Sequence, residues 1–237
     1  MSESNKRNFI VHGSILAIAG ILVRIIGMLY RIPVVNIIGS EGNGIYGAAF
    51  NIYNIMLVLS SYGLPMAVSK LVSARFTKRR YKSAAKVLRC SLMVAVCTGG
   101  IAALLVFFGA SFIENVIYGG GLPGLAIPLR ILAPTIFLVA ILGVIRGFFQ
   151  GQSTMIPTAV SQILEQIVNA IVSIAAGYGM MKAFASSPDV AAYGAAGSTL
   201  GTAMGALTAV LFMGFLYAVY TPTFNRLKRK DRHTENQ

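Results

Sequence analysis

The hydrophobic positions of the chain form six long, nearly continuous runs separated by short polar connections. The runs cover approximately residues 9–38, 44–74, 84–112, 128–149, 155–181 and 191–220. Each run is long enough for an α-helix to cross the roughly 30 Å of hydrocarbon in a bilayer, which takes about 20 residues. Continuous runs favour helices over the alternating strands of a transmembrane barrel. The pattern therefore predicts an all-α, polytopic membrane protein built as a bundle of six transmembrane helices.

The composition supports this class and leaves little room for a soluble domain. Of the 237 residues, 56% are hydrophobic and 11% are charged, whereas soluble domains carry about 25% charged residues. We expect residues 1–222 to form one membrane lobe and residues 223–237 to form a basic, disordered cytoplasmic tail. No phosphate-binding loop, metal-ligand spacing or catalytic arrangement is visible. The sequence thus predicts a protein that is not an enzyme and that needs no cofactor or metal ion.

The net charge of +13 is distributed in a way that orients the chain in the membrane. Basic residues gather beside apolar runs, at residues 6–7, 75–82 and 226–232. The connections at 39–43, 113–127 and 182–190 carry Glu41, Glu114 and Asp189 instead, with Lys182 as their only basic residue. Because basic loops stay in the cytoplasm, both termini are expected on the cytoplasmic side. This placement beside membrane spans also argues against nucleic acid as the partner. The glycine-rich connection at 113–127 is expected to be a flexible outer loop.

Two arginines lie within the first apolar run. At 1.5 Å per residue from Gly13, Arg24 is about 16 Å deep, and Arg31 is about 10 Å further along the same face. A charge at mid-membrane is costly and usually faces a bundle interior or a wet cavity. For Arg31, extension to the outer head groups is an equally good interpretation. Because a guanidinium binds phosphate through two parallel hydrogen bonds, the arginines indicate an anionic, phosphate-bearing substrate.

The fifth run carries a polar stripe at helical spacing. Its members are Gln162, Glu165, Gln166 and Asn169. Counted from Thr154, Glu165 is also about 16 Å deep, so we expect an ion pair between Glu165 and Arg24. This pair would open when a substrate phosphate competes with Glu165 for the arginine. The alternative is that the stripe joins helices through hydrogen bonds, which are worth only about 0.6 kcal/mol each.

The second run also has a polar face, followed by a proline. Asn51, Asn54 and Ser61 share one side of the helix and complete the set of candidate substrate-contacting residues. Pro65 lies inside the same run, where it removes one backbone hydrogen bond and permits a kink. A kink that serves packing alone is equally consistent with this sequence.

Two further patterns are interpreted as structural. Gly194, Gly197, Gly201 and Gly205 form a small-residue ridge in the sixth run that lets two helices approach closely. Arg130 and Arg146 bracket the fourth run and are expected to anchor it at the membrane interfaces.

Residues 20–76 contain three segments that carry a family resemblance. They read GILVRIIGMLYRIP, GSEGNGIYG and SSYGLPMAVSKLV. The chain resembles the polysaccharide-biosynthesis or stage V sporulation protein B-like flippases, which belong to the multidrug/oligosaccharidyl-lipid/polysaccharide exporter superfamily and are relatives of the lipid II flippase. The resemblance implies transport of undecaprenyl-pyrophosphate-linked saccharides across the bacterial cell membrane by alternating access of two lobes. It also implies that Arg24 and, less directly, Arg31 line the central cavity.

The resemblance sets the size of the expected assembly. Family members are about twice as long as this chain and contain two six-helix lobes, so the chain corresponds to a single lobe. A second lobe or chain is therefore an expected partner, because one lobe supplies only half of an alternating-access cavity. Two other functions stay open: a lobe of a cation-coupled multidrug exporter, and a non-transporting membrane fragment or scaffold.

Overall fold

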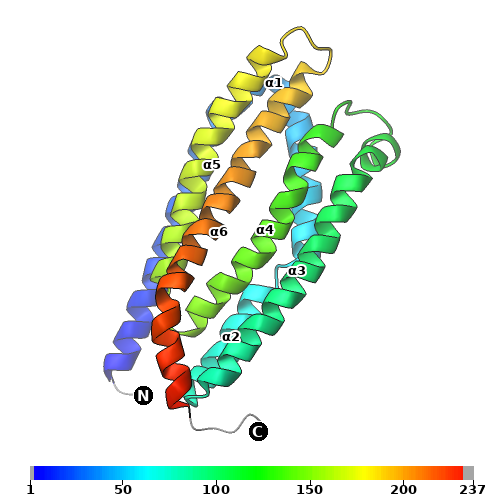
Figure 1. Cartoon of the computed structure of the whole chain (residues 1–237). Coiled ribbons are helices and arrows are strands. Elements are labelled where there is room, and N and C mark those ends of the chain that lie inside the picture. Colours follow the sequence, from blue (N-terminus) through cyan, green and yellow to red (C-terminus); the bar gives the residue numbers. More distant parts are fainter. Residues whose placement is uncertain (1–2, 232–237) are drawn as a thin grey trace.

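The computed structural model of the chain describes residues 3–231, and their side chains from Gly13 onward. Within that range the chain is helical and contains no strand, which confirms the all-α, polytopic prediction. The elements are α1 (Glu3–Ser60), α2 (Leu64–Thr77), α3 (Tyr81–Phe112), the π-helical turn η1 (Ile113–Ile117), α4 (Ala126–Gly151), α5 (Ile156–Ala183) and α6 (Val190–Lys230). They form an elongated bundle in which α5 packs along α6 and α3 packs along α4 (Figure 1).

Helix α1 consists of two arms that run in opposite directions. Gly39 joins them in a non-helical conformation, with φ 71° and ψ −176°, a region that glycine occupies without the steric cost of a side chain. The guanidinium carbon of Arg31 lies 6.0 Å from the centre of the Tyr46 ring, although 15 residues of straight helix would separate them by about 22 Å. We call residues 3–38 the first arm and residues 40–60 the second arm (Figure 1).

The number of separate membrane-spanning helices differs from the six expected. Among the described residues, five stretches are long and apolar enough to cross a membrane: Gly13–Thr77, Tyr81–Ile117, Ala126–Gly151, Ile156–Ala183 and Val190–Lys230. The first of these contains both the first and the second apolar run, because the reversal at Gly39 has no intervening loop. The other four stretches correspond to the remaining four runs.

The ends of the bundle separate the basic connections from the acidic ones. The start of α1 and the end of α6 lie at one end (Figure 1), where the backbone N–H of Lys82 donates a 2.9 Å hydrogen bond to the Asp231 carboxylate. At the opposite end, Gly42 approaches Ala191 and Gly124 approaches Ala192. The structure therefore agrees with the segregation of charge in the sequence, and the assignment of the basic end to the cytoplasm stays a prediction.

Two helix boundaries correct the sequence-based expectations. Pro65 is not inside a kinked helix: α1 ends at Ser60, residues 61–63 form a turn, and Pro65 lies in the first turn of α2, where a proline costs no helical hydrogen bond. The disorder expected for the tail at 223–237 is also wrong over residues 223–230, because α6 continues through Pro222 to Lys230; residues 232–237 lie outside the described part of the chain. Phe224 explains the continuation, since it is buried and stacks on Phe76 with ring centroids 6.1 Å apart.

Two glycine ridges bring helices into close contact. A Cβ added at Gly197 or Gly205 of α6 would meet the α5 backbone, lying 2.6 Å from the Glu165 carbonyl oxygen in the second case; the predicted ridge is therefore confirmed. A second ridge on α4 was not anticipated. A Cβ at Gly143 would lie 2.9 Å from the Pro65 ring, and one at Gly147 would lie 2.5 Å from the Pro65 carbonyl oxygen. The α4 ridge thus fixes the start of α2 directly against α4.

The connection after α3 is more ordered than expected. It begins with η1, and the Glu114 carboxylate accepts hydrogen bonds from the backbone N–H groups of Gly124 (3.1 Å) and Ala126 (2.7 Å). These contacts satisfy N–H groups at the start of α4, and a negative charge is favourable at that end of a helix dipole. Glu114 therefore acts as the N-terminal cap of α4 from outside the helix.

Candidate functional site

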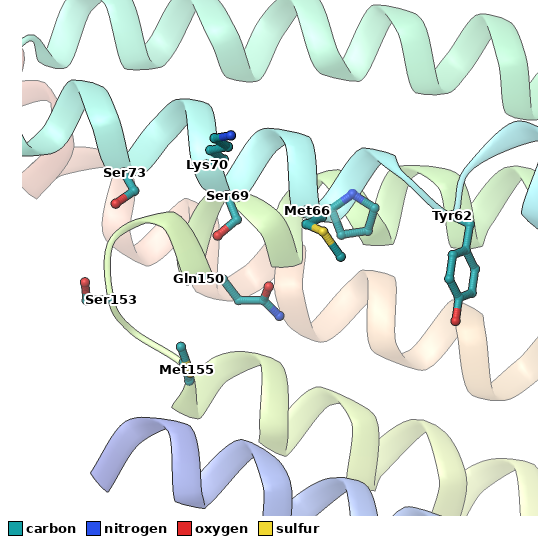
Figure 2. A pocket seen from close by; sticks show the side chains of 9 residues that line it. Tyr62, Met66, Ser69, Lys70, Ser73, Gln150, Ser153 and Met155 are labelled. Atoms are coloured by element: carbon teal, nitrogen blue, oxygen red, sulfur yellow. The ribbon is translucent and has the colours of Figure 1, made fainter. Parts of the chain in front are cut away.

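A groove with both apolar and polar side chains runs between α2 and α4, from the basic end of the bundle toward its middle. It consists of two hollows of about 480 and 340 Å³ that share Tyr62, Pro65 and Gln150. We call the two together the α2–α4 groove. The outer hollow is lined by Tyr62, Pro65, Met66, Ser69, Lys70, Ser73, Gln150, Ser153 and Met155, and the inner one by Leu57, Ser61, Tyr62, Pro65, Val139, Gly143, Arg146, Gln150 and Gln162. Figure 2 shows Ser69 and Met66 of α2 opposite Gln150 at the end of α4.

The break between α1 and α2 shapes the inner part of this groove. The turn at residues 61–63 exposes Tyr62 while Ser61 stays buried. The Ser60 carbonyl, which lacks a helical partner at this point, accepts a 3.1 Å hydrogen bond from the Thr98 hydroxyl of α3. The irregular backbone therefore lies where protein contacts satisfy it and where it borders a polar cavity, as helix breaks in membranes require.

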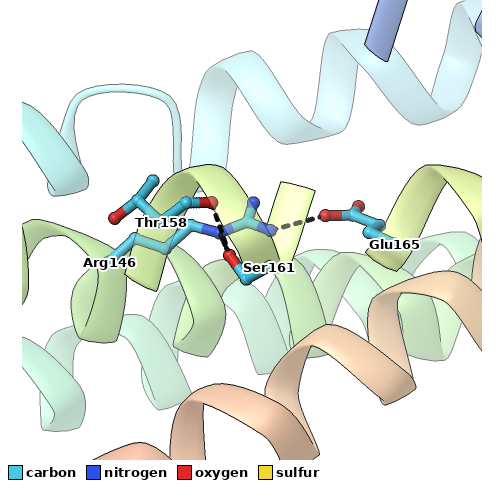
Figure 3. Close-up of polar contacts among 4 residues, drawn as sticks. All are labelled: Arg146, Thr158, Ser161 and Glu165. Carbon is cyan, nitrogen blue, oxygen red and sulfur yellow. Dashed lines mark hydrogen bonds and ion pairs between the residues drawn. The ribbon is translucent and has the colours of Figure 1, made fainter. Parts of the chain in front are cut away.

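Arg146, which lines the inner hollow, forms an ion pair with Glu165 of α5. The Nη2 of Arg146 lies 2.7 Å from Oε2 of Glu165, and Nε of Arg146 donates a 2.9 Å hydrogen bond to the Ser161 hydroxyl. Ser161 in turn donates to the Thr158 carbonyl. Figure 3 shows the Arg146 side chain reaching from α4 toward these α5 residues. The arginine is therefore held in a fixed orientation by two partners on the neighbouring helix.

The burial of this pair explains why it forms. The side chains of Arg146 and Glu165 are only 14% and 26% exposed. At 1.5 Å per residue, Arg146 lies about 8 Å from the end of α4 at Gly151, and Glu165 about 14 Å from the start of α5 at Ile156. A charge at such a depth is stable only when it is paired or faces water. Arg146 both forms a pair and lines the groove.

This geometry corrects two expectations. In this structure Glu165 pairs with Arg146, and the expected pair between Glu165 and Arg24 is not formed. Arg24 is exposed on the first arm and has no ion-pair partner among the side chains described from Gly13 onward. Arg146 is not an interfacial anchor but a groove residue. Arg130 at the other end of α4 is exposed and donates to the Ser111 hydroxyl.

The rest of the fifth-run stripe divides between two environments. Gln162 lines the inner hollow together with Ser61. Gln166 faces the first arm, since a Cβ at Gly27 would lie 3.2 Å from its amide nitrogen. Asn169 is buried, and its amide donates to the Tyr30 hydroxyl at 3.2 Å. The structure thus brings Ser61, Gln162 and Glu165 together around Arg146, while Gln166 and Asn169 face the first arm.

The remaining candidates lie outside the groove. Arg24, Arg31, Asn51 and Asn54 are all exposed on the two arms of α1. The guanidinium of Arg31 lies over the Tyr46 ring of the second arm, an attractive arrangement of a cation with an aromatic face. These polar side chains therefore belong to a surface of the lobe that no other described helix covers.

The sequence interpretation missed Arg146, Tyr62 and Gln150 as groove residues. One signal in the sequence could have identified Arg146 and Gln150. They are four residues apart and share a helix face with the glycines at 143 and 147. A glycine face marks where another helix approaches, so polar side chains on its border are candidates for a protein-lined cavity.

Comparison with known proteins now identifies the family. The sequence model of the family described as polysaccharide biosynthesis protein matches residues 10–234. The chain belongs to this family. The match covers every described helix except the first turns of α1, and it confirms the resemblance carried by residues 20–76.

Three proteins of Bacillus subtilis (strain 168) are among the relatives of this family member. The lipid II flippase MurJ is 34% identical over 176 residues, covering 72% of this chain and 32% of MurJ. Stage V sporulation protein B is 30% identical over 210 residues, covering 88% of this chain and 39% of the relative. The uncharacterized membrane protein YabM is 29% identical over 232 residues, with coverages of 98% and 41%.

These matches support the family assignment but cover only part of each relative. The chain spans well under half of the length of the curated relatives that it matches. The family assignment and the flippase among the relatives agree with a membrane transport protein rather than an enzyme. No solved structure matches the chain significantly.

Proposed function

We propose that this chain is one lobe of a flippase that moves a lipid-linked saccharide across the bacterial cell membrane by alternating access. The observation that carries the proposal is the α2–α4 groove, whose serine, glutamine and lysine side chains lead from the basic end of the bundle to the partly buried Arg146. The family assignment and the similarity to a lipid II flippase support the same substrate class. The substrate would be an undecaprenyl-pyrophosphate-linked saccharide whose lipid tail stays in the bilayer.

The groove offers separate partners for the two polar parts of such a head group. Ser61, Gln150 and Gln162 can exchange hydrogen bonds with sugar hydroxyls. Arg146 offers a guanidinium for the phosphates. A phosphate that enters the inner hollow competes with Glu165 for this guanidinium, so binding would loosen the link between α4 and α5. The competition first expected at Arg24 is thus reassigned to Arg146.

Arg24, Arg31, Asn51 and Asn54 are proposed to face the other half of the transport cavity. An exposed arginine or asparagine within a membrane-spanning helix is costly against lipid. A second lobe, in another chain or another part of a longer protein, would cover this surface and enclose a wet cavity. With the basic end of the bundle in the cytoplasm, the groove would open toward the side on which lipid-linked precursors are made.

Glu165 argues against the multidrug-exporter alternative. A site for cationic drugs needs an available carboxylate, whereas the Glu165 carboxylate is neutralised by Arg146 at 2.7 Å. A fragment or scaffold without transport activity would have no need for an arginine and glutamines that line a groove within the membrane-spanning helices. The lipid-linked saccharide is therefore the substrate that the groove supports best.

Photocrosslinking in bacterial membranes tests the proposal. A photoreactive residue replaces Tyr62, which is 77% exposed at the groove, and in a control chain it replaces Leu211, which is 64% exposed on α6. Position 62 should capture a lipid-linked saccharide, and position 211 should capture bulk phospholipid only. Equal capture at both positions, or capture of phospholipid alone at position 62, would contradict the proposal. Displacement of the crosslink by a cationic dye would favour the exporter.

A further inference from the structure

A second, separate cleft lies where the start of α3 meets the end of α6. It has a volume of about 570 Å³ and is lined by Lys82, Asn225, Lys228 and Arg229. None of these residues lines the α2–α4 groove. Three cationic side chains and one amide thus converge on a single hollow, with no carboxylate among its lining residues. Such a set of donors is complementary to a phosphate group.

The cations are carried by a rigid frame. The Nζ of Lys228 lies 5.2 Å from the centre of the Phe224 ring, and Phe224 is 1% exposed. Phe224 packs edge-on against Phe148 with ring centroids 5.4 Å apart. The backbone of Lys82 is tied to the end of α6 through Asp231. These contacts fix the backbone of both walls, so the three cationic side chains extend from a fixed frame into the same cleft.

Among the described residues, Asp231 is the acidic residue that contacts the walls of this cleft. Its carboxylate accepts the hydrogen bond from the Lys82 backbone and is itself buried. It therefore joins the two walls of the cleft, and its single charge does not balance Lys82, Lys228 and Arg229. The cleft keeps a net positive charge.

The cleft lies at the depth of the lipid head groups. The apolar run of α6 ends near Tyr220, and Asn225 and Arg229 lie about 8 and 14 Å further along the helix. The head-group layer extends about 5–8 Å beyond each side of the hydrocarbon. Asn225 is therefore within or at the edge of that layer, and flexible lysine and arginine side chains reach back into it.

We propose that this cleft binds the phosphate head group of an anionic phospholipid in the adjacent leaflet. Lys82, Lys228 and Arg229 would bind the phosphodiester, and the Asn225 amide would bind a head-group hydroxyl such as those of phosphatidylglycerol. Basic pockets between membrane helices recognise anionic lipids in this way. The lipid would link the start of α3 to the end of α6. This site does not depend on the proposed transport function.

Native mass spectrometry of the purified full chain tests the site. The chain is reconstituted in phosphatidylcholine nanodiscs with and without phosphatidylglycerol, and the retained lipid and the Tm are measured. The variant Lys82→Gln/Lys228→Gln/Arg229→Gln should bind phosphatidylglycerol about a hundredfold more weakly, at about 1 kcal/mol for each basic residue and 1.4 kcal/mol for each tenfold change. It should also lose the lipid-dependent rise in Tm.

A charge-matched control separates a site from diffuse attraction. Lys78→Gln/Lys86→Gln/Arg89→Gln removes two lysines and one arginine that are exposed but do not line the cleft. It should retain phosphatidylglycerol like the wild type. The variant Lys82→Arg/Lys228→Arg keeps the charge and should also retain phosphatidylglycerol. This result would show that the cleft tolerates substitution. Equal losses in the two triple variants would overturn the proposal. So would a rise in Tm caused by inorganic phosphate in phosphatidylcholine nanodiscs, because the ligand would then be a soluble anion.

Discussion

At the scale of single residues, the pair formed by Arg146 and Glu165 decides how the groove is interpreted. Removal of one partner leaves the other charge partly buried without compensation. For fully buried pairs this costs about 3–5 kcal/mol, and the cost here should be lower because both side chains retain some exposure. The pair therefore has a structural role that must be separated from its proposed role in substrate binding.

A double substitution separates the two roles. Arg146→Ala and Glu165→Ala should each lower the Tm of the purified chain, and the double variant should be more stable than the less stable single variant, because no unpaired charge remains. If Arg146 binds the substrate phosphate, the double variant should still fail to crosslink the saccharide lipid at position 62. Recovery of crosslinking in the double variant would show that Arg146 acts only as the partner of Glu165.

Arg24 should behave differently from Arg146. It has no ion-pair partner among the described side chains, so Arg24→Ala should leave the Tm of the chain nearly unchanged. If Arg24 faces the other half of the cavity, transport measured in the assembled protein should be lost. Arg24→Lys should retain part of it, because the charge stays while the bidentate geometry is lost. Arg130→Ala, at an exposed arginine of α4, serves as the control and should transport normally.

The residue scale also shows what the sequence could and could not predict. Helical spacing correctly placed Gln162 and Glu165 on one face, and the depth of Glu165 correctly indicated that it needs a partner. Depth alone could not select that partner, because it gives the position along a helix and not the direction around the bundle. Arg146 was overlooked for this reason, although its side chain is long enough to reach deeper than its backbone.

At the scale of elements, close contact between α2 and α4 holds the groove in shape. A Cβ at Gly147 would lie 2.5 Å from a backbone oxygen of Pro65, which cannot move without displacing α2. Gly147→Ala should therefore destabilise the chain by about 1–3 kcal/mol, the usual range for overpacking. It should also weaken crosslinking at position 62.

A second glycine provides the control for this prediction. Gly214 lies in α6, and a Cβ there would meet nothing within 4 Å. Because alanine favours helices over glycine by about 1 kcal/mol, Gly214→Ala should keep or slightly raise the Tm. If the two substitutions had the same effect in thermal unfolding, the α4 ridge would not have the packing role assigned to it.

Element boundaries were harder to predict than element types. The apolar runs correctly indicated every long helix, because hydrophobic length is a direct signal in a membrane protein. The polar connection at residues 39–43 correctly marked the reversal, but the structure turns at Gly39 alone and is helical on both sides of it, so the two runs became one continuous helical stretch. The end of α6 was also missed, because Phe224, one aromatic residue in a polar tail, extends the helix through contacts that only the tertiary structure reveals.

At the scale of the whole molecule, the separation of charge between the two ends predicts the topology. Basic residues at 75–82 and 226–230 belong to the end of the bundle where α1 starts and α6 ends. Glu114 and Asp189 lie beside Gly124 at the other end, and Glu41 precedes Gly42, which approaches Ala191 there. The positive-inside rule therefore places the basic end in the cytoplasm.

Cysteine labelling in intact cells tests this orientation. In a background without Cys90 and Cys97, a cysteine at Lys78 should be protected from a membrane-impermeant reagent, and a cysteine at Gly120 should react. Both positions are exposed in the structure, so a difference in labelling reports the side of the membrane and not burial. The reverse pattern would invert the topology and, with it, the side toward which the groove opens.

The reversal at Gly39 also has a consequence for biogenesis. The two arms of α1 follow each other without a loop, so only the short polar segment at residues 39–43 has to cross the bilayer between them. They can leave the translocon together as a helical hairpin rather than one after the other. Insertion of Arg24 at mid-membrane costs about 2.5–3.5 kcal/mol on translocon scales. The favourable insertion free energy of two apolar segments, instead of one, would then offset this cost. The geometry of one glycine thus gives a mid-membrane arginine a route into the bilayer before any partner helix has been made.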